Sequence, residues 1–163
     1  MTVACLGSSG LIGRAVARLL EVCGDKVNLW DVDNGDLAYR DNEIGEYADY
    51  ALEGCEAVVH LAGRRASVAS QEAQGFDLIA GNLSTDIAVF KAARKAKIRK
   101  LVYASTISTY GGFCPEIGWT ERDHVLFDRT VALPDDSVRF SAGAKLTAER
   151  LIEDVAAEGG PTW

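Results

Sequence analysis

Apolar and polar residues follow two distinct patterns along this chain. Short continuous apolar runs that end near a glycine or a polar residue predict buried β-strands, and segments with apolar residues three or four positions apart predict amphipathic helices. Strands are predicted at 2–6, 26–30, 57–61 and 100–104, with a further short strand at 36–40. Helices are predicted at 11–23, 45–53, 82–97 and 142–157, with an irregular segment at 111–140.

Strands that alternate with helices predict βαβ units, whose crossovers are right-handed and whose strands are parallel. The sequence therefore predicts an α/β fold with a doubly wound parallel sheet of the Rossmann type, formed by one domain over residues 1–163. The last predicted helix is followed only by Gly159–Trp163, where the alternation calls for another strand. The fold is therefore expected to be truncated at its C-terminal side.

The composition narrows the classes of partner. Hydrophobic residues make up 48% of the chain and charged residues 25%, which predicts a packed core. The net charge of −7 argues against nucleic acid as a partner, because affinity for a phosphate backbone depends on clustered Lys and Arg. No apolar run reaches the roughly 18–20 residues of a membrane span, and the N-terminus lacks the basic region of a secretory signal. We expect a cytoplasmic protein without a membrane partner, and the four cysteines predict neither a metal site nor a disulfide framework.

A glycine-rich segment, GSSGLIG at 7–13, joins the first predicted strand to the first predicted helix. Gly7 permits a tight turn, Gly10 lets a pyrophosphate approach the backbone, and Gly13 lets the helix pack closely on the sheet. The negative charge of such a ligand would meet free N–H groups at the positive end of the helix dipole. A turn without a ligand is the alternative, but the position between strand and helix favours nucleotide binding.

Asp31 ends the second predicted strand and is the candidate partner of the adenosine ribose. A carboxylate there can accept both ribose hydroxyls and repels a 2′-phosphate, which favours NAD over NADP. The alternative is an ordinary strand-ending Asp in a turn. Arg14, directly after Gly13, keeps NADP open as a second possibility.

Four motifs together carry a family resemblance. They are GSSGLIG at 7–13, VVHLAG at 58–63, NLST at 82–85 followed by Ala92–Ala93, and KLVYASTISTYG at 100–111. In this order they resemble the motifs of the extended short-chain dehydrogenase/reductase family, the NAD-dependent epimerases and dehydratases of sugar nucleotides and related compounds. The resemblance runs from Thr2 to about Asp154. It spans about half of a usual member, because the substrate-binding C-terminal region has no counterpart here.

The resemblance implies site residues by position. The implied cofactor-binding residues are Gly7, Ser9, Gly10, Leu11, Ile12, Gly13, Asp31, Asp41, Leu61, Ala62, Gly63, Asn82 and Lys145. The implied catalytic positions are Thr106, Ser141 and Lys145. Thr106 would hydrogen-bond the substrate oxygen that gains or loses a proton, and Lys145 would hold the nicotinamide ribose.

One departure from the family pattern bears directly on turnover. The family has a tyrosine four residues before the lysine, and this chain has Ser141 before Lys145. Realignment does not recover the tyrosine, because every tyrosine of the chain precedes residue 111. A serine hydroxyl is far less acidic than a phenol, so general acid–base help of about 10²–10⁴-fold would be lost unless another group supplies it.

Two hypotheses of function follow. The first is an NAD-binding oxidoreductase of the epimerase/dehydratase type, or the cofactor-binding portion of one, that moves hydride at a sugar or similar hydroxyl. The second is a nucleotide-binding module without turnover, either a pseudoenzyme or a truncated gene product. Ser141 and the missing C-terminal half favour the second. Its small-molecule substrate cannot be read from these residues. The resemblance also implies a homodimer that pairs through the helices at 82–97 and 142–157. His60, at a strand end, is interpreted as a packed histidine rather than a catalyst.

Overall fold

The computed structural model describes residues 1–35, 37, 46–64, 68–106, 109 and 136–162, with the backbone alone at 46, 68–75 and 136–142. Four strands and four α-helices alternate along it, as the sequence predicts. The strands are β1 (Thr2–Leu6), β2 (Lys26–Trp30), β3 (Ala57–His60) and β4 (Lys100–Tyr103). The helices are α1 (Leu11–Val22), the 3-10 helix η1 (Val32–Asn34), α2 (Glu46–Leu52), α3 (Val68–Lys95) and α4 (Asp136–Ala157).

The four strands form one parallel sheet in the order β2-β1-β3-β4. Cys5 of β1 is aligned with Leu29 on one side and with Val59 on the other. His60 is aligned with Tyr103 where β3 and β4 end. Because all strands are parallel, their carboxyl ends meet at one edge of the sheet, and the loops that follow them lie together there.

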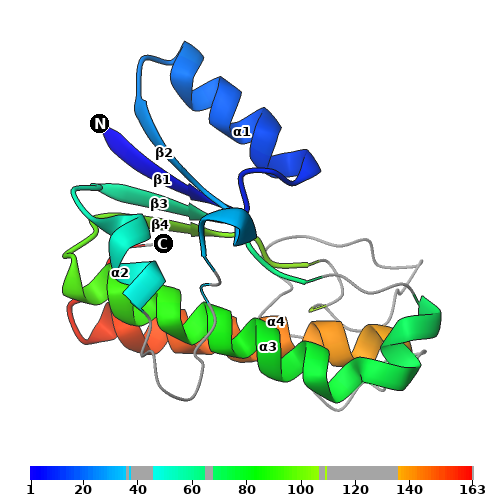
Figure 1. The fold of residues 1–163 in the computed structure, drawn as a ribbon. Coiled ribbons are helices and arrows are strands. Elements are labelled where there is room, and N and C mark those ends of the chain that lie inside the picture. Colours follow the sequence, from blue (N-terminus) through cyan, green and yellow to red (C-terminus); the bar gives the residue numbers. More distant parts are fainter. Residues whose placement is uncertain (36, 38–45, 65–67, 107–108, 110–135, 163) are drawn as a thin grey trace, which may run out of the picture.

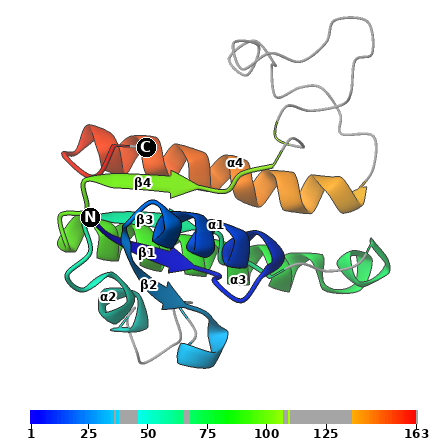
Figure 2. The same cartoon turned by 90° about the horizontal axis from the view of Figure 1, so that it is seen from above.

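The sheet is covered on both faces, which confirms the predicted doubly wound architecture. Helix α1 lies on one face, and α2, α3 and α4 lie on the other (Figure 1). Seen from above, α4 lies alongside β4, and α3 runs beneath β3 (Figure 2). The two helices α3 and α4 pack against each other. Beyond β4, Thr162 pairs in parallel with Lys100, at the position that a next strand would occupy.

The hydrophobic core lies between the sheet and the helices α2, α3 and α4. Leu6, Val58 and Leu101 point from three neighbouring strands into this core, where they meet Val89 of α3 and Ile152 of α4. The predicted apolar stripe of the last helix is confirmed, because its alanines are buried and its larger residues pack on the core. None of the helices in the described parts of the chain is long and apolar enough to cross a membrane.

Helix α1 packs differently from the amphipathic pattern of its sequence. Its buried residues are Gly13 and Ala17, whereas Leu11 is 84% exposed and both Ile12 and Leu19 are also exposed. The helix approaches the sheet through its smallest side chains, so its apolar spacing marks the helix correctly but not its buried face.

Two helices begin earlier than the sequence predicts. Helix α3 starts at Val68 rather than at residue 82, and α4 starts at Asp136 rather than at 142. Residues 68–81 contain Ala, Gln and Glu without a regular apolar stripe, so helix propensity rather than amphipathicity favours this part of α3. The strand predicted at 36–40 lies outside the described residues, apart from the buried Leu37.

Candidate nucleotide-binding and active site

The glycine turn between β1 and α1 is held against the ends of two other strands. Gly7 has φ +82°, and its N–H donates to the Trp30 carbonyl at 2.8 Å. A Cβ at Gly7 would lie 2.8 Å from the Ala62 nitrogen, and a Cβ at Gly13 would lie 2.1 Å from the Gly7 oxygen. Two of the predicted glycines are therefore required by close backbone contacts.

A cleft of about 320 Å³ opens beside this turn, at the carboxyl ends of β1, β2 and β3. It contains seven of the residues predicted to bind a cofactor, namely Gly7, Ser9, Gly10, Asp31, Leu61, Ala62 and Gly63. Further lining residues are Val32, Gly35, Leu37, Arg64 and Thr85. This is the edge at which doubly wound sheets bind their ligands.

Asp31 is oriented by the glycine turn across the cleft. Its Oδ2 accepts a hydrogen bond from the Ser9 N–H at 2.8 Å, and its Oδ1 accepts one from the Val32 N–H at 2.8 Å. Partial burial acts to raise the pKa of the Asp31 carboxyl, but the hydrogen bonds from Ser9 and Val32 outweigh it and lower that pKa below its usual value. The group is therefore a fixed carboxylate at neutral pH.

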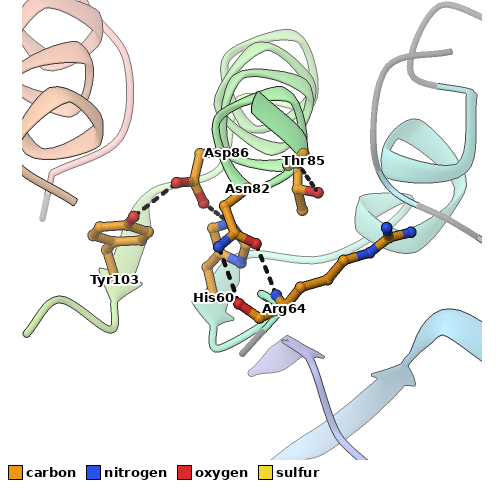
Figure 3. Close-up of polar contacts among 7 residues, drawn as sticks. His60, Arg64, Asn82, Thr85, Asp86 and Tyr103 are labelled. Carbon is orange, nitrogen blue, oxygen red and sulfur yellow. Dashed lines mark hydrogen bonds and ion pairs between the residues drawn. The ribbon is translucent and has the colours of Figure 1, made fainter. Parts of the chain in front are cut away.

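Asn82 of α3 fixes the turn that follows β3. Its Oδ1 accepts a hydrogen bond from the Arg64 N–H at 2.7 Å, and its Nδ2 donates to the Arg64 carbonyl at 3.1 Å (Figure 3). A Cβ at Gly63 would lie 3.7 Å from the same Asn82 oxygen. Asn82 thus holds the backbone of the cleft residue Arg64 in place without lining the cleft itself.

A buried polar group lies where β3 and β4 end beneath α3. The Asp86 Oδ1 lies 2.9 Å from the His60 Nε2, and the Tyr103 hydroxyl donates to the Asp86 Oδ2 at 2.8 Å (Figure 3). His60 and Asp86 are the buried polar residues among those described. His60 is therefore a packed, hydrogen-bonded residue, in line with its interpretation from the sequence.

Lys145 reaches this group from α4. Its Nζ lies 4.1 Å from the centroid of the Tyr103 ring. Burial lowers the pKa of the Lys145 ammonium, although the carboxylates of Asp86 and Glu149 oppose this effect. The Ser105 hydroxyl donates to Glu149.

Tyr103 is the nearest described phenol to Lys145, but its chemistry does not suit proton transfer. Burial, and next the negative charge of Asp86, raise the pKa of the Tyr103 hydroxyl far above its usual value. The phenol therefore keeps its proton, which it donates to Asp86. It lies at the end of β4, whereas the resemblance implies a tyrosine at position 141 on α4.

The other predicted site residues lie around the cleft or beyond the described set. Thr106, half-buried after β4, closes a turn through its carbonyl, which accepts from the Thr109 N–H at 3.1 Å and hydroxyl at 2.8 Å. Ser141 lies one helical turn before Lys145 on α4, and its side chain is not among those described. Asp41 lies outside the described residues. Residues predicted to bind a cofactor but absent from the cleft lining are Leu11, Ile12, Gly13, Asn82 and Lys145.

Comparison with protein-family models gives one match, to the NAD dependent epimerase/dehydratase family, over residues 3–162. The chain belongs to this family. The match spans nearly the whole chain and confirms the resemblance carried by its four motifs. No curated protein sequence matches the chain.

Solved structures share the fold. A short-chain dehydrogenase/reductase superfamily protein from Agrobacterium tumefaciens with bound NAD is 25% identical, with a TM-score of 0.69 over 94% of this chain and 44% of that one. A UDP-N-acetylglucosamine 4-epimerase from Bacillus cereus is 25% identical, with a TM-score of 0.71 over 98% of this chain and 50% of that one. A GDP-L-fucose synthetase from Naegleria fowleri bound to NADP is 18% identical, with a TM-score of 0.76 over 99% and 51%. The chain therefore spans about half the length of these structures.

Sequence reasoning did not identify Asp86 as part of the site. Two signals could have found it. Asp86 follows Asn82 by four residues on the same helix, so both side chains face the same way. His60 and Tyr103 end neighbouring parallel strands, so a polar group on the covering helix can reach both.

Proposed function

We propose that this chain binds a nicotinamide dinucleotide beside the glycine turn, as the cofactor-binding part of an oxidoreductase that acts on a sugar nucleotide or a related hydroxyl compound. The observation that carries the proposal is the position of Asp31, hydrogen-bonded to Ser9 across a cleft of about 320 Å³ at the N-terminus of α1. Family membership supports it, as does the NAD bound to the Agrobacterium tumefaciens structure.

The glycine turn and Asp31 give the cleft two features that a dinucleotide can use. Gly7 and Gly10 have no side chains, so a ligand can approach the turn and the start of α1 closely. Gly10 is the N-cap of α1 and makes no side-chain hydrogen bond to it. Backbone N–H groups and the helix dipole would face the pyrophosphate there. Asp31, already a carboxylate, would accept the two ribose hydroxyls and repel a 2′-phosphate, so we infer a preference for NAD over NADP.

Lys145 and Thr106 would serve the reactive end of the ligand. A bound nicotinamide would supply hydride chemistry, which protein side chains lack. The ammonium of Lys145 would donate hydrogen bonds to the nicotinamide ribose, and the Thr106 hydroxyl would hydrogen-bond the substrate oxygen. With Ser141 at the position of the family tyrosine, we infer that cofactor binding is retained and that hydride transfer is slow.

A module that binds the cofactor without turnover is the second candidate function. It is favoured by Tyr103, whose raised pKa removes the nearest described phenol as a substitute acid. The two candidates share the binding site and differ only in turnover, so the binding experiment comes first.

Calorimetric titration with NAD(H) and NADP(H) tests the proposed site. We expect NAD(H) to bind more tightly, and Asp31→Asn to weaken its binding about tenfold by removing a charged acceptor. Asp33→Asn is the matched control, because Asp33 is exposed on η1 and does not line the cleft. Equal or reversed affinities for the two cofactors in the unmodified protein would contradict the role of Asp31.

A further inference from the structure

Asp86 is a buried acidic side chain whose two oxygens are both engaged. One oxygen faces the His60 Nε2 at 2.9 Å, and the other accepts the Tyr103 hydroxyl at 2.8 Å. The residue is 1% exposed, and His60 is fully buried. Two donors on two oxygens is the arrangement that suits a carboxylate, which only accepts hydrogen bonds. The His60 Nε2 then carries the donated proton, and its buried Nδ1 has no hydrogen-bond partner among the described residues.

A buried carboxylate is stable only where hydrogen bonds and a nearby positive charge compensate it. The nearby positive charge is that of Lys145, whose Nζ lies 4.1 Å from the Tyr103 ring centroid. Tyr103 therefore lies between the two charges, with its hydroxyl on the carboxylate and its ring beneath the ammonium. A phenol that donates to a carboxylate is polarised toward its ring, which strengthens the attraction of the ring for a cation.

We propose that Asp86 is a positioning residue that acts through Tyr103 to hold the Lys145 side chain protonated and in place over the ring. The inference deepens the proposed function, on which it rests, because Lys145 is the residue we assign to the nicotinamide ribose. It gives a reason for a buried acidic residue on α3 that none of the family motifs predicted. His60 secures the second oxygen of Asp86 and so fixes the orientation of the carboxylate.

Among the described residues, the charged and titratable groups around Lys145 come from three elements. Asp86 belongs to α3, Tyr103 to β4, and Glu149 to α4, where it also accepts the Ser105 hydroxyl. Burial favours the neutral amine, and the carboxylates of Asp86 and Glu149 both favour the ammonium. Of the carboxylates in the described part of the chain that favour the ammonium, removing the charge of Asp86 leaves Glu149 to oppose burial, and Lys145 should release its proton at lower pH.

The experiment follows the titration of Lys145 directly and needs no cofactor. The protein is labelled with ¹³C-lysine, and the Cε signal of Lys145 is assigned by its loss in Lys145→Arg and followed from neutral to alkaline pH. We expect Asp86→Asn to weaken the proton affinity of Lys145 about tenfold, the effect of losing one close opposite charge. Asp49→Asn is the matched control, because Asp49 pairs with the exposed Lys95, and it should leave the Lys145 titration unchanged.

Tyr103→Phe provides a second variant in case Asp86→Asn does not fold. It keeps the ring beneath Lys145 and removes the hydroxyl that links the ring to Asp86, so it too should lower the pKa of Lys145. An unchanged Lys145 titration in either variant, with a native amide spectrum, would overturn the inference. If the pKa of Lys145 fell only in Glu149→Gln, the inference would also be overturned, because the effect would belong to Glu149. If cofactor fails to bind, the proposed function fails while this titration still decides the role of Asp86.

Discussion

Replacing Gly13 by alanine tests the close packing of α1 that positions the glycine turn. The added Cβ would lie 2.1 Å from the Gly7 oxygen and 2.9 Å from both the Gly7 carbonyl carbon and the Ser8 Cα. Favourable contacts between carbon atoms occur at about 3.5–4.0 Å, so the helix and the turn would have to separate by roughly 1 Å or more. All three contacted atoms belong to the backbone, which cannot rotate away as a flexible side chain could.

The expected loss in the free energy of unfolding is at the upper end of the range measured for overpacked sites. Extra methyl groups in well-packed sites destabilise by about 1–3 kcal/mol, and the turn is held further by the hydrogen bond from Gly7 to Trp30. We expect a loss of about 3 kcal/mol, or roughly 6–12 °C in melting temperature for a domain of this size. Cofactor affinity should fall as well, because the same movement displaces the turn that lines the cleft.

Thermal and urea unfolding followed by circular dichroism provide the assay. Gly81→Ala is the matched control, since Gly81 also lies in a helix but a Cβ there meets nothing within 4 Å. That variant should gain up to about 1 kcal/mol from the higher helix propensity of alanine. If Gly13→Ala proved as stable as Gly81→Ala, the close contact between α1 and the turn would be refuted.

Three further predictions concern turnover, acid stability and assembly. Ser141→Tyr should raise the rate of hydride transfer by about 10²-fold or more, measured by nicotinamide absorbance with a panel of sugar nucleotides. If the unmodified chain already turns over well, and Ser141→Tyr does not change its rate, another residue transfers the proton. Because the pKa of Asp31 is lower in the folded protein than in the unfolded chain, its stabilisation is present at neutral pH and lost as pH falls through the acidic range. Asp31→Asn should therefore flatten the decline of stability in acid, whereas a decline identical to that of the unmodified protein would show no such linkage. The chain should sediment as a dimer formed through α3 and α4, and a monomer at micromolar concentration would contradict that expectation.

Sequence and structure agree most closely at the glycine turn and the sheet. Each strand is bounded by signals within a few residues, such as Gly24 and Gly54, which take positive φ angles where helices end. The agreement weakens where helix boundaries depend on more than apolar spacing. Helix α3 begins at Val68, although residues 68–81 lack the regular apolar spacing that predicts a helix from sequence.

The residues predicted for the site also fall into two groups, those that line the cleft and those that do not. Seven cofactor residues predicted from contiguous motifs line one cleft, because parallel strands deliver their carboxyl ends to one edge. Leu11 and Ile12 follow the turn in sequence but point to solvent, since α1 approaches the sheet through Gly13 and Ala17. Which face of a helix is buried depends on the surface it meets, and that surface is built from distant segments.

The sequence by itself determined the alternation of strands and helices, the glycine turn, the carboxylate at Asp31 and the serine at position 141, because each is encoded in neighbouring residues. Only the tertiary structure placed Asp86 between His60 and Tyr103, with Lys145 over the ring. These four residues come from β3, α3, β4 and α4, and no local pattern relates them. Their meeting depends on the register of two strands and on how α3 and α4 pack across them, which is a property of the assembled fold.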